Sequence, residues 1–317
     1  MIDRFGRDIN YLRVSVTDRC NYRCQYCMPH DGVKTMAHED LLSFEEMFMV
    51  IHHFVSIGVK KVRLTGGEPL VRKGILGFIQ SLSRINKLED IALTTNGALL
   101  KSMAADLKRS GLHRVNVSLD TLKPDRFTLL TRGGNLQDVL DGISEARSVG
   151  LIVKLNCVLN KDINIDEIKD FVDLSRDWNL DVRFIELMPI GENVAYSMKN
   201  YVSTNEVLLQ CPKLVPVDAV DPSSPARYFQ LPDAIGKVGL ISPMSCNFCN
   251  DCNRLRLTPD GKLKPCLHND LEIDLREPLR NGENIMPLIL EAIQVKPEKH
   301  LLDQHKTIVR QMSQIGG

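Results

Sequence analysis

Cysteine is the residue type whose spacing in this chain of 317 residues points most directly to chemistry. A first group, Cys20, Cys24 and Cys27, follows the pattern C-x3-C-x2-C. Three thiolates in one loop can hold three irons of a four-iron cluster and leave the fourth iron open. A zinc knuckle is the alternative, but structural zinc takes four ligands and no fourth ligand is obvious here. The first group therefore favours an iron–sulfur cluster with one open iron.

A second group of thiols lies nearer the end of the chain. Cys249 and Cys252 form a C-x2-C pair, and Cys266 follows after thirteen further residues. Cys246 precedes the pair at the same short spacing, so it could add a fourth thiolate and close a zinc or iron–sulfur site. Spacing alone does not decide between an open site of three thiolates and a closed site of four.

Six segments of the first two thirds of the chain have the composition of short β-strands, and helical patterns separate most of them. Ser43-Phe-Glu-Glu46 has the capping-box signature of a helix start after the first strand. Six β–α units in series favour a parallel sheet, and we expect an α/β fold with an incomplete (β/α)6 barrel rather than an open sheet. The predicted strands cover residues 12–17, 61–65, 91–95, 114–119, 152–158 and 182–187.

Polar side chains recur with one parity on these strands, although both faces of a strand in a parallel barrel are expected to be apolar. Because side chains alternate between the two faces, they form a single row, which we place in the barrel lumen. Unpaired buried cations would each cost several kcal/mol, so the row predicts a large anionic ligand. Scattered buried polar groups that are already paired are the alternative. The row includes Arg13, Arg63, Thr94, Ser118, Lys154 and Arg183.

From about residue 215 the pattern changes, and we divide the chain into a barrel, 1–214, and an extension, 215–317. Two antiparallel hairpins that cover the open side of the barrel are expected here, followed by a helix. Arg254 and Arg256 share one face of a hairpin strand, which suits a triphosphate, although a solvated hairpin face has the same pattern. The hairpins pair residues 227–231 with 237–241 and 254–258 with 262–266, and the helix covers 285–293.

The overall composition narrows the classes of partner. Forty Lys and Arg residues balance forty Asp and Glu residues, and this argues against a nucleic-acid coat or a membrane-surface protein. The charged first residues lack the apolar core of a signal peptide. We therefore expect a cytoplasmic protein without nucleic-acid or membrane partners. Nine cysteines in a reducing compartment favour metal binding or catalysis over disulfides.

Together with three motifs on the next strands, the first cysteine group resembles the cluster motif of the radical S-adenosylmethionine (SAM) superfamily. These motifs are Gly66-Gly67-Glu68-Pro69 after the second strand, Thr94-Thr95-Asn96-Gly97 after the third and Ser118-Leu119-Asp120 after the fourth. The glycine pair would let backbone approach a ligand closely. Over nearly the whole chain the sequence is similar, more narrowly, to the GTP 3′,8-cyclase family of molybdenum cofactor biosynthesis. The segments that carry this likeness cover residues 63–70, 131–134, 183–188 and 248–257 and the terminal Gly-Gly.

The resemblance implies a radical SAM barrel with two [4Fe-4S] clusters. Their ligands would be Cys20, Cys24 and Cys27 for the first cluster and Cys249, Cys252 and Cys266 for the second. Cys246 departs from the usual family spacing and leaves the openness of the second cluster undecided. SAM would contact Tyr26, Gly67, Ser118 and Met188, and GTP would contact Arg13, Arg63, Thr94, Lys154, Arg254 and Arg256. Arg13, Gly316 and Gly317 would act in catalysis, because in the family the Gly-Gly tail inserts into the active site.

The same resemblance implies the reaction and its partners. A radical derived from SAM would remove hydrogen from the ribose C3′ of GTP, and the resulting carbon radical would attack C8 of guanine. The implied partners are a reductant such as flavodoxin or ferredoxin, the downstream cyclic pyranopterin monophosphate synthase and a second copy of the chain in a homodimer. A two-cluster radical SAM enzyme of peptide maturation would explain the cysteines but not Arg254-Leu-Arg256 or the Gly-Gly end. An iron–sulfur electron carrier would need four cysteines for each closed cluster.

Overall fold

The computed structural model describes residues 1–178, 180–219, 221, 223–246, 248–300 and 308–316. Within them, one sheet runs in the order β12-β11-β10-β1-β2-β3-β4-β5-β6-β9-β8-β7. Its strands are β1 (Tyr11–Ser15), β2 (Lys61–Thr65), β3 (Asp90–Thr95), β4 (Arg114–Ser118), β5 (Ile152–Leu159), β6 (Asp181–Glu186), β7 (Val215–Val217), β8 (Ala226–Gln230), β9 (Val238–Ile241), β10 (Arg254–Leu257), β11 (Lys262–Lys264) and β12 (Ile273–Asp274).

The central strands of this sheet are parallel. β1 to β6 pair with their neighbours in chain order, and each pairing is parallel. β10 adds to the free edge of β1 and β9 to the free edge of β6, again in parallel. Within the described residues β7 and β12 form the two edges of the sheet and do not pair, so the barrel stays open, as predicted. The expected hairpins, β8–β9 and β10–β11, flank the open side from both edges.

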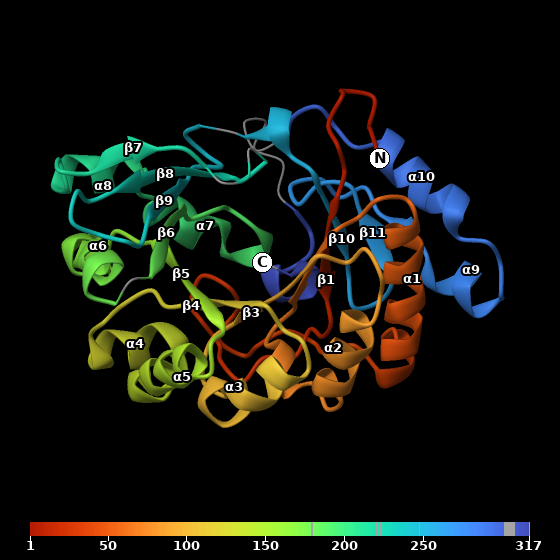
Figure 1. Cartoon of the computed structure of the whole chain (residues 1–317), viewed down its shortest axis with the longest axis horizontal. Helices are drawn as coiled ribbons and strands as arrows, with labels where there is room; N and C mark the ends of the chain where they lie inside the picture. Colours follow the sequence, from red (N-terminus) through yellow and green to blue (C-terminus); the bar gives the residue numbers. More distant parts are fainter. Residues whose placement is uncertain (179, 220, 222, 247, 301–307, 317) are drawn as a thin grey trace.

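Helices cover the outer face of the curved sheet (Figure 1). The first of them begins with the capping box predicted from Ser43 and Glu46, in which each side chain bonds the other residue's backbone N–H. The helices are α1 (Phe44–Ser56), α2 (Ile75–Ser83), α3 (Leu100–Arg109), α4 (Pro124–Thr131), α5 (Leu136–Ser148), α6 (Ile168–Asp177), α7 (Val194–Lys199), α8 (Asn205–Gln210), α9 (Arg276–Arg280), α10 (Met286–Gln294) and α11 (Met312–Ile315).

The core lies between the sheet and these helices. Side chains of the apolar parity, such as Val62 and Leu64 on β2, are completely buried there. They pack in one cluster with the inner faces of the helices, including Ile51 of α1 and Ile79 of α2. The opposite parity therefore faces the lumen, as predicted. Among the described residues, we find no helix whose length and apolar character would let it cross a membrane.

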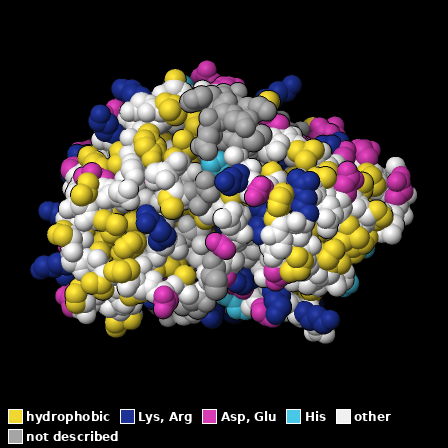
Figure 2. All heavy atoms as spheres, turned by 90° about the horizontal axis from the view of Figure 1, so that it is seen from above, with side chains coloured by type: hydrophobic (Ala, Val, Ile, Leu, Met, Phe, Trp, Pro, Cys, Tyr) yellow, Lys and Arg dark blue, Asp and Glu magenta, His cyan; other side chains and the backbone are white. Residues whose placement is uncertain are grey.

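The outer surface and the lumen differ in charge. On the face shown in Figure 2, Lys and Arg side chains are interspersed with Asp and Glu. This mixture agrees with the equal numbers of the two charges in the sequence. The lumen instead gathers arginines, with Arg256, Arg13 and Arg63 in register on β10, β1 and β2. The C-terminal end of the chain lies near the centre of the barrel (Figure 1).

Candidate active site

The two cysteine groups lie at opposite ends of the lumen. Cys20 follows the carboxyl end of β1, whereas Cys252 precedes the amino end of β10, which is parallel to β1. Cys266 follows β11, which is antiparallel to β10, so it returns to the same end as Cys252. The five residues of β1 separate these ends by on the order of 13 Å. A substrate that reaches both groups must span the lumen.

The first cysteine group is a partly buried set of thiols without disulfides. Burial raises the pKa of the Cys27 thiol to about 12, and negative charge on Cys20 and Asp120 adds to that effect. The backbone N–H of Tyr22 donates to Cys20 Sγ at 3.4 Å, and the backbone N–H of Ser313 lowers the pKa of Cys27 in part. Such crowded thiols resist deprotonation until a cationic iron core offsets their charge. The donor set therefore fits an iron–sulfur cluster held by one thiolate per iron.

The glycine pair packs against the loop that carries these cysteines. A Cβ on Gly66 would overlap with the carbonyl oxygen of Thr17, and one on Gly67 would overlap with that of Arg19. The backbone N–H of Gly67 donates to the Thr17 carbonyl at 2.8 Å, and Glu68 N–H donates to the Arg19 carbonyl at 2.8 Å. The close approach seen here is thus to the cysteine loop. A contact of Gly67 with SAM stays a prediction.

Two buried carboxylates organise the same end of the barrel. Glu68 accepts hydrogen bonds from Leu70 N–H (3.0 Å), Thr95 Oγ1 (2.8 Å) and Asn96 N–H (2.7 Å), and burial raises its pKa to about 7. Asp120 accepts from the Tyr26 hydroxyl and from Val158 N–H, each at 2.7 Å. In the sequence both acids stand out only as parts of motifs. In the structure both acids are identified by their burial and by the hydrogen bonds that they accept.

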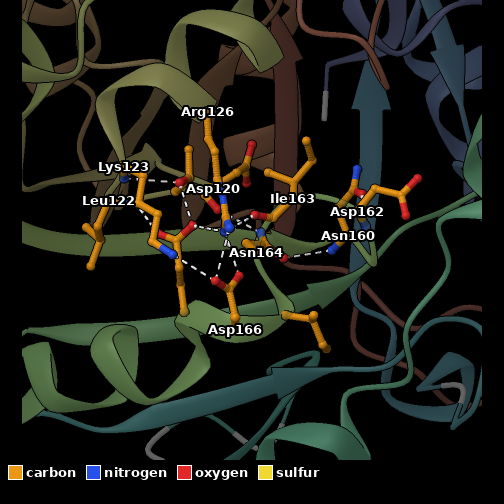
Figure 3. A network of polar contacts seen from close by, with 12 residues as sticks. Asp120, Leu122, Lys123, Arg126, Asn160, Asp162, Ile163, Asn164 and Asp166 are labelled. Atoms are coloured by element: carbon orange, nitrogen blue, oxygen red, sulfur yellow. Dashed lines mark hydrogen bonds and ion pairs between the residues drawn. The ribbon is translucent and has the colours of Figure 1, made fainter.

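A polar network fixes the loop that holds Asp120 (Figure 3). Asn164 Nδ2 donates to the Asp120 carbonyl at 2.7 Å. Close by, Asp166 pairs with Arg126 at 2.5 Å and with Lys123 at 2.7 Å. Asp120, just after β4, accepts from Tyr26 and from Val158 near the end of β5, so it connects Tyr26 to the ends of both strands. Ser118, the other predicted SAM contact here, lies half-buried in register with Asn156.

Buried and half-buried arginines line the lumen between the two cysteine groups. Arg256, Arg13 and Arg63 lie side by side in register on β10, β1 and β2. Burial, with repulsion from Arg256, lowers the pKa of Arg13 to about 9; burial also lowers that of Arg63 to about 9. Within the described residues, several buried lumen atoms have no hydrogen-bond partner. They are Nε of Arg13, Arg63, Arg183 and Arg254, Oη of Tyr11, Oγ1 of Thr94 and Oδ1 of Asn156.

These unpaired groups are what a polyanionic ligand would satisfy, because phosphate oxygens accept from guanidinium and hydroxyl groups. Lys154 differs from the arginines. Its ammonium lies on the same row but already pairs with Asp181 at 2.7 Å. The polar row predicted from strand parity is therefore present. Lys154 is already paired with a carboxylate, so the positive charge available to a ligand comes from the arginines.

The end of the chain enters this lumen. The Gly316 carbonyl accepts a hydrogen bond from the Arg256 guanidinium. A Cβ at Gly316 would overlap with Thr65 Oγ1 and lie 3.2 Å from the Cβ of Ser15, and its φ of 72° favours glycine. Met188, a predicted SAM contact, packs in an apolar cluster with Ile308 and Ile315 of the same tail. Gly317 lies outside the described residues.

The second cysteine group contains a cation that the sequence reasoning missed. Lys296, almost fully buried, donates to Cys252 Sγ at 3.5 Å and to the carbonyls of Arg254 and Pro265, both at 2.8 Å. Burial alone would raise the pKa of Cys252, but Arg254 and Lys296 lower it to about 6. No sequence signal marks Lys296, since it lies thirty residues beyond Cys266.

The thiols of the second group also differ in exposure. Cys249 is buried, Cys252 and Cys266 are half-buried, and Cys246 is exposed. Burial raises the pKa of Cys249, and negative charge on Cys266 and Cys252 raises it further. This set of three fits an open cluster. In the described part of the chain, no three His, Cys, Asp or Glu side chains converge on a single metal ion, whereas a four-iron cluster takes each thiolate on a different iron.

Comparisons with known proteins identify the family and the fold of this chain. The model of the radical SAM superfamily matches residues 14–175, and the model Molybdenum Cofactor Synthesis C matches residues 180–302. The crystal structure of Streptococcus suis SuiB bound to S-adenosylmethionine has a TM-score of 0.62 at 14% identity, covering 89% of this chain and 65% of that chain. Native anSMEcpe with bound AdoMet has a TM-score of 0.58 at 13% identity, covering 91% and 81%. Fold and site together are those of a radical SAM enzyme.

Relatives with similar sequences show to which family of radical SAM enzymes the chain belongs. GTP 3′,8-cyclase of Peptoclostridium acidaminophilum is 53% identical over 320 residues, covering 100% of this chain and 98% of that protein. GTP 3′,8-cyclase of Alkaliphilus oremlandii is 51% identical over 321 residues, covering 100% of both. The chain belongs to the GTP 3′,8-cyclase family, and the resemblance predicted from its motifs is confirmed. The likeness to SuiB, at 14% identity, concerns the fold alone.

Proposed function

We propose that this protein converts GTP into (8S)-3′,8-cyclo-7,8-dihydroguanosine 5′-triphosphate with SAM, in the first step of molybdenum cofactor biosynthesis. Full-length identity of about half to proteins of that name supports the reaction. One observation of the site carries the proposal: Arg256, Arg13 and Arg63 lie in register between two cysteine triads, and Nε of Arg13 and Nε of Arg63 have no hydrogen-bond partner among the described residues. A nucleoside triphosphate has both the negative charge and the length that this lumen requires.

The first triad would hold a [4Fe-4S] cluster and present its open iron to SAM. Tyr26, fixed by Asp120, and Gly67, Ser118 and Met188 would surround that ligand at the carboxyl end of the barrel. When bound, the reduced cluster supplies the electron that cleaves SAM, and the resulting radical chemistry belongs to the cofactors. The surrounding residues orient SAM toward the lumen and exclude water from it.

A second [4Fe-4S] cluster would be held by Cys249, Cys252 and Cys266, with guanine at its open iron. The exposed Cys246 is not a ligand in this proposal. Lys296 would hold Cys252 and the two ends of the β10–β11 hairpin together. Placing guanine at this end leaves the ribose toward the first triad, as attack on C3′ requires.

The triphosphate would lie along the arginine row. Arg13, Arg63, Arg254 and Arg256 would donate to its oxygens, while Thr94 and Lys154 complete the wall. Arg13 would also act in catalysis together with Gly316 and Gly317, the residues of the tail. Binding would offset the mutual repulsion of these cations, which is why such a pocket selects a strongly negative ligand.

We further propose the organisation around this reaction. Residues 1–214 would form the barrel with the first cluster, and residues 215–317 the extension with the second cluster and the tail. All nine cysteines are free, in keeping with a reducing cytoplasm. An external reductant such as flavodoxin or ferredoxin would supply electrons, cyclic pyranopterin monophosphate synthase would take the product, and the chain would act as a homodimer.

Product analysis tests this function. Anaerobically reconstituted protein is incubated with GTP, SAM and dithionite, and the products are separated and weighed by mass spectrometry. We expect 5′-deoxyadenosine and a nucleotide with the mass of GTP but a different retention time. SAM cleavage with GTP recovered unchanged would contradict the proposal and favour the peptide-maturation alternative.

A further inference from the structure

Arg310, at the start of the tail, makes the most extensive charge pairing of any described residue in that segment. Its Nη1 and Nη2 donate to the two carboxylate oxygens of Asp260 at 3.0 and 2.8 Å. Its Nη2 and Nε also reach the two oxygens of Glu272, both at 2.7 Å. The three side chains are between 15 and 20% exposed, so water screens the pairing less than at the surface. Bidentate geometry fixes orientation as well as distance.

The two carboxylates lie on either side of β11 in the chain, in the part of the sheet that carries Arg254 and Arg256. Asp260 lies in the turn between β10 and β11, and Glu272 lies just before β12. Glu272 also accepts from Lys264 of β11, a fully buried ammonium, at 3.0 Å. Arg310 therefore joins the tail to the part of the sheet, β10 to β12, that holds Arg256.

Beyond Arg310 the tail makes contacts that lead step by step into the lumen. The Gln311 side chain accepts a hydrogen bond at 3.4 Å from the N–H of Glu192, which lies in the segment between β6 and α7. The backbone N–H of Ser313 favours the thiolate form of Cys27, and the Gly316 carbonyl accepts from Arg256. These later contacts are single hydrogen bonds and a small apolar cluster. The Arg310 pairing is the strongest anchor available to hold them in place.

We propose that Arg310 is a positioning residue for cyclisation: by pairing with Asp260 and Glu272 it docks the tail on the β10–β11 hairpin and so presents Gly316 at Arg256. This inference rests on the proposed function, because it assigns the tail a task in that reaction. It extends the function by naming the contact that sets the position of the tail. The guanidinium of Arg310 acts through these two carboxylates, so Arg310 itself is not one of the residues proposed to contact GTP or a cluster.

The test compares Arg310→Gln, Arg310→Lys and Asp260→Asn with the unaltered enzyme, all reconstituted anaerobically. Hydrogen exchange of residues 311–316, read by mass spectrometry, reports docking without reference to activity. We expect exchange in Arg310→Gln to quicken by roughly tenfold or more, since a charge-assisted pair is lost. The turnover number for cyclisation should fall by a similar factor, with unchanged KM for SAM and unchanged iron content.

Two comparisons separate positioning from general damage to the fold. Arg310→Lys keeps one charged contact, so its turnover number should be higher than that of Arg310→Gln. The turnover number of the double variant Arg310→Gln/Asp260→Asn should be no lower than that of Arg310→Gln alone, because both substitutions break the same pairing. Arg176→Gln, which removes an arginine paired with Asp173 on the surface of α6, should behave as the unaltered enzyme. Losses that simply add in the double variant would overturn the proposal.

Other outcomes are equally decisive. Unchanged exchange at 311–316 in Arg310→Gln would overturn the docking role, and faster exchange with full turnover would overturn the role in the reaction. Loss of iron in Arg310→Gln would show a structural effect and also overturn it. If the unaltered enzyme does not cyclise GTP, the proposed function fails, and the exchange data still decide whether Arg310 docks the tail.

Discussion

Replacing Arg63 by methionine removes one guanidinium from the lumen and keeps an apolar side chain of similar length. Arg63 is only 8% exposed, its Nε has no partner in the described residues, and it lies beside Arg13 across β1 and β2. Burial lowers its pKa to about 9, so the protonated form is held at a cost when no ligand is present. The substitution should therefore leave the melting temperature of the ligand-free protein unchanged or raise it.

GTP affinity should fall in the same variant. A hydrogen bond to a charged group contributes about 1.5–3 kcal/mol, which corresponds to roughly 10- to 150-fold in Kd. Calorimetric titration with GTP measures this loss, and titration with SAM should give an unchanged Kd.

Lys154→Met is the matched control for this prediction. Because Lys154 already pairs with Asp181 in the ligand-free protein, its removal leaves a carboxylate unpaired and should destabilise the fold by about 1–3 kcal/mol. Its effect on GTP affinity should be smaller than that of Arg63→Met. If Arg63→Met binds GTP normally, or loses as much stability as Lys154→Met, the assignment of the unpaired arginines to a polyanion is wrong.

Four further substitutions, in three predictions, test other parts of the site. Burial raises the Glu68 pKa from 4.5 to about 7, so between these pH values the folded protein binds more protons than the unfolded chain. The free energy of unfolding, measured with urea, should therefore fall as pH rises from about 5 to 7. Glu68→Gln should make this free energy less dependent on pH. Cys246→Ser should retain about eight irons per chain and Cys252→Ser about four; equal losses would make Cys246 a ligand. Gly316→Ala should abolish cyclisation with both clusters intact, since its Cβ would overlap with Thr65 Oγ1; normal turnover would refute the role assigned to the tail.

Local patterns in the sequence predicted the parts of the fold that depend on neighbouring residues. Strand parity placed Arg13 and Arg63 on one face, and the capping box marked the start of α1. The two hairpins followed from turn residues and alternation, and they pair as expected. Each of these features is fixed within a few residues of chain, where backbone geometry alone constrains the outcome.

Contacts between distant segments could not be predicted in the same way. Nothing local indicates that β10 pairs with β1, yet this pairing sets Arg256 beside Arg13 and sends the two cysteine triads to opposite ends. Lys296 and Arg310 reach their partners only after the extension has packed against the barrel. Such contacts depend on which edges and faces remain free once the core has formed, and residue spacing does not encode that information.

The central claim is that the lumen holds GTP with its ribose facing the first cysteine triad. GTP labelled with deuterium at C3′ tests it most directly, in a single turnover of the anaerobic, reduced enzyme with SAM. We predict that the 5′-deoxyadenosine formed carries one deuterium and that the cyclised nucleotide has lost it. Unlabelled 5′-deoxyadenosine, with the deuterium still on the nucleotide, would contradict the placement of GTP in the lumen.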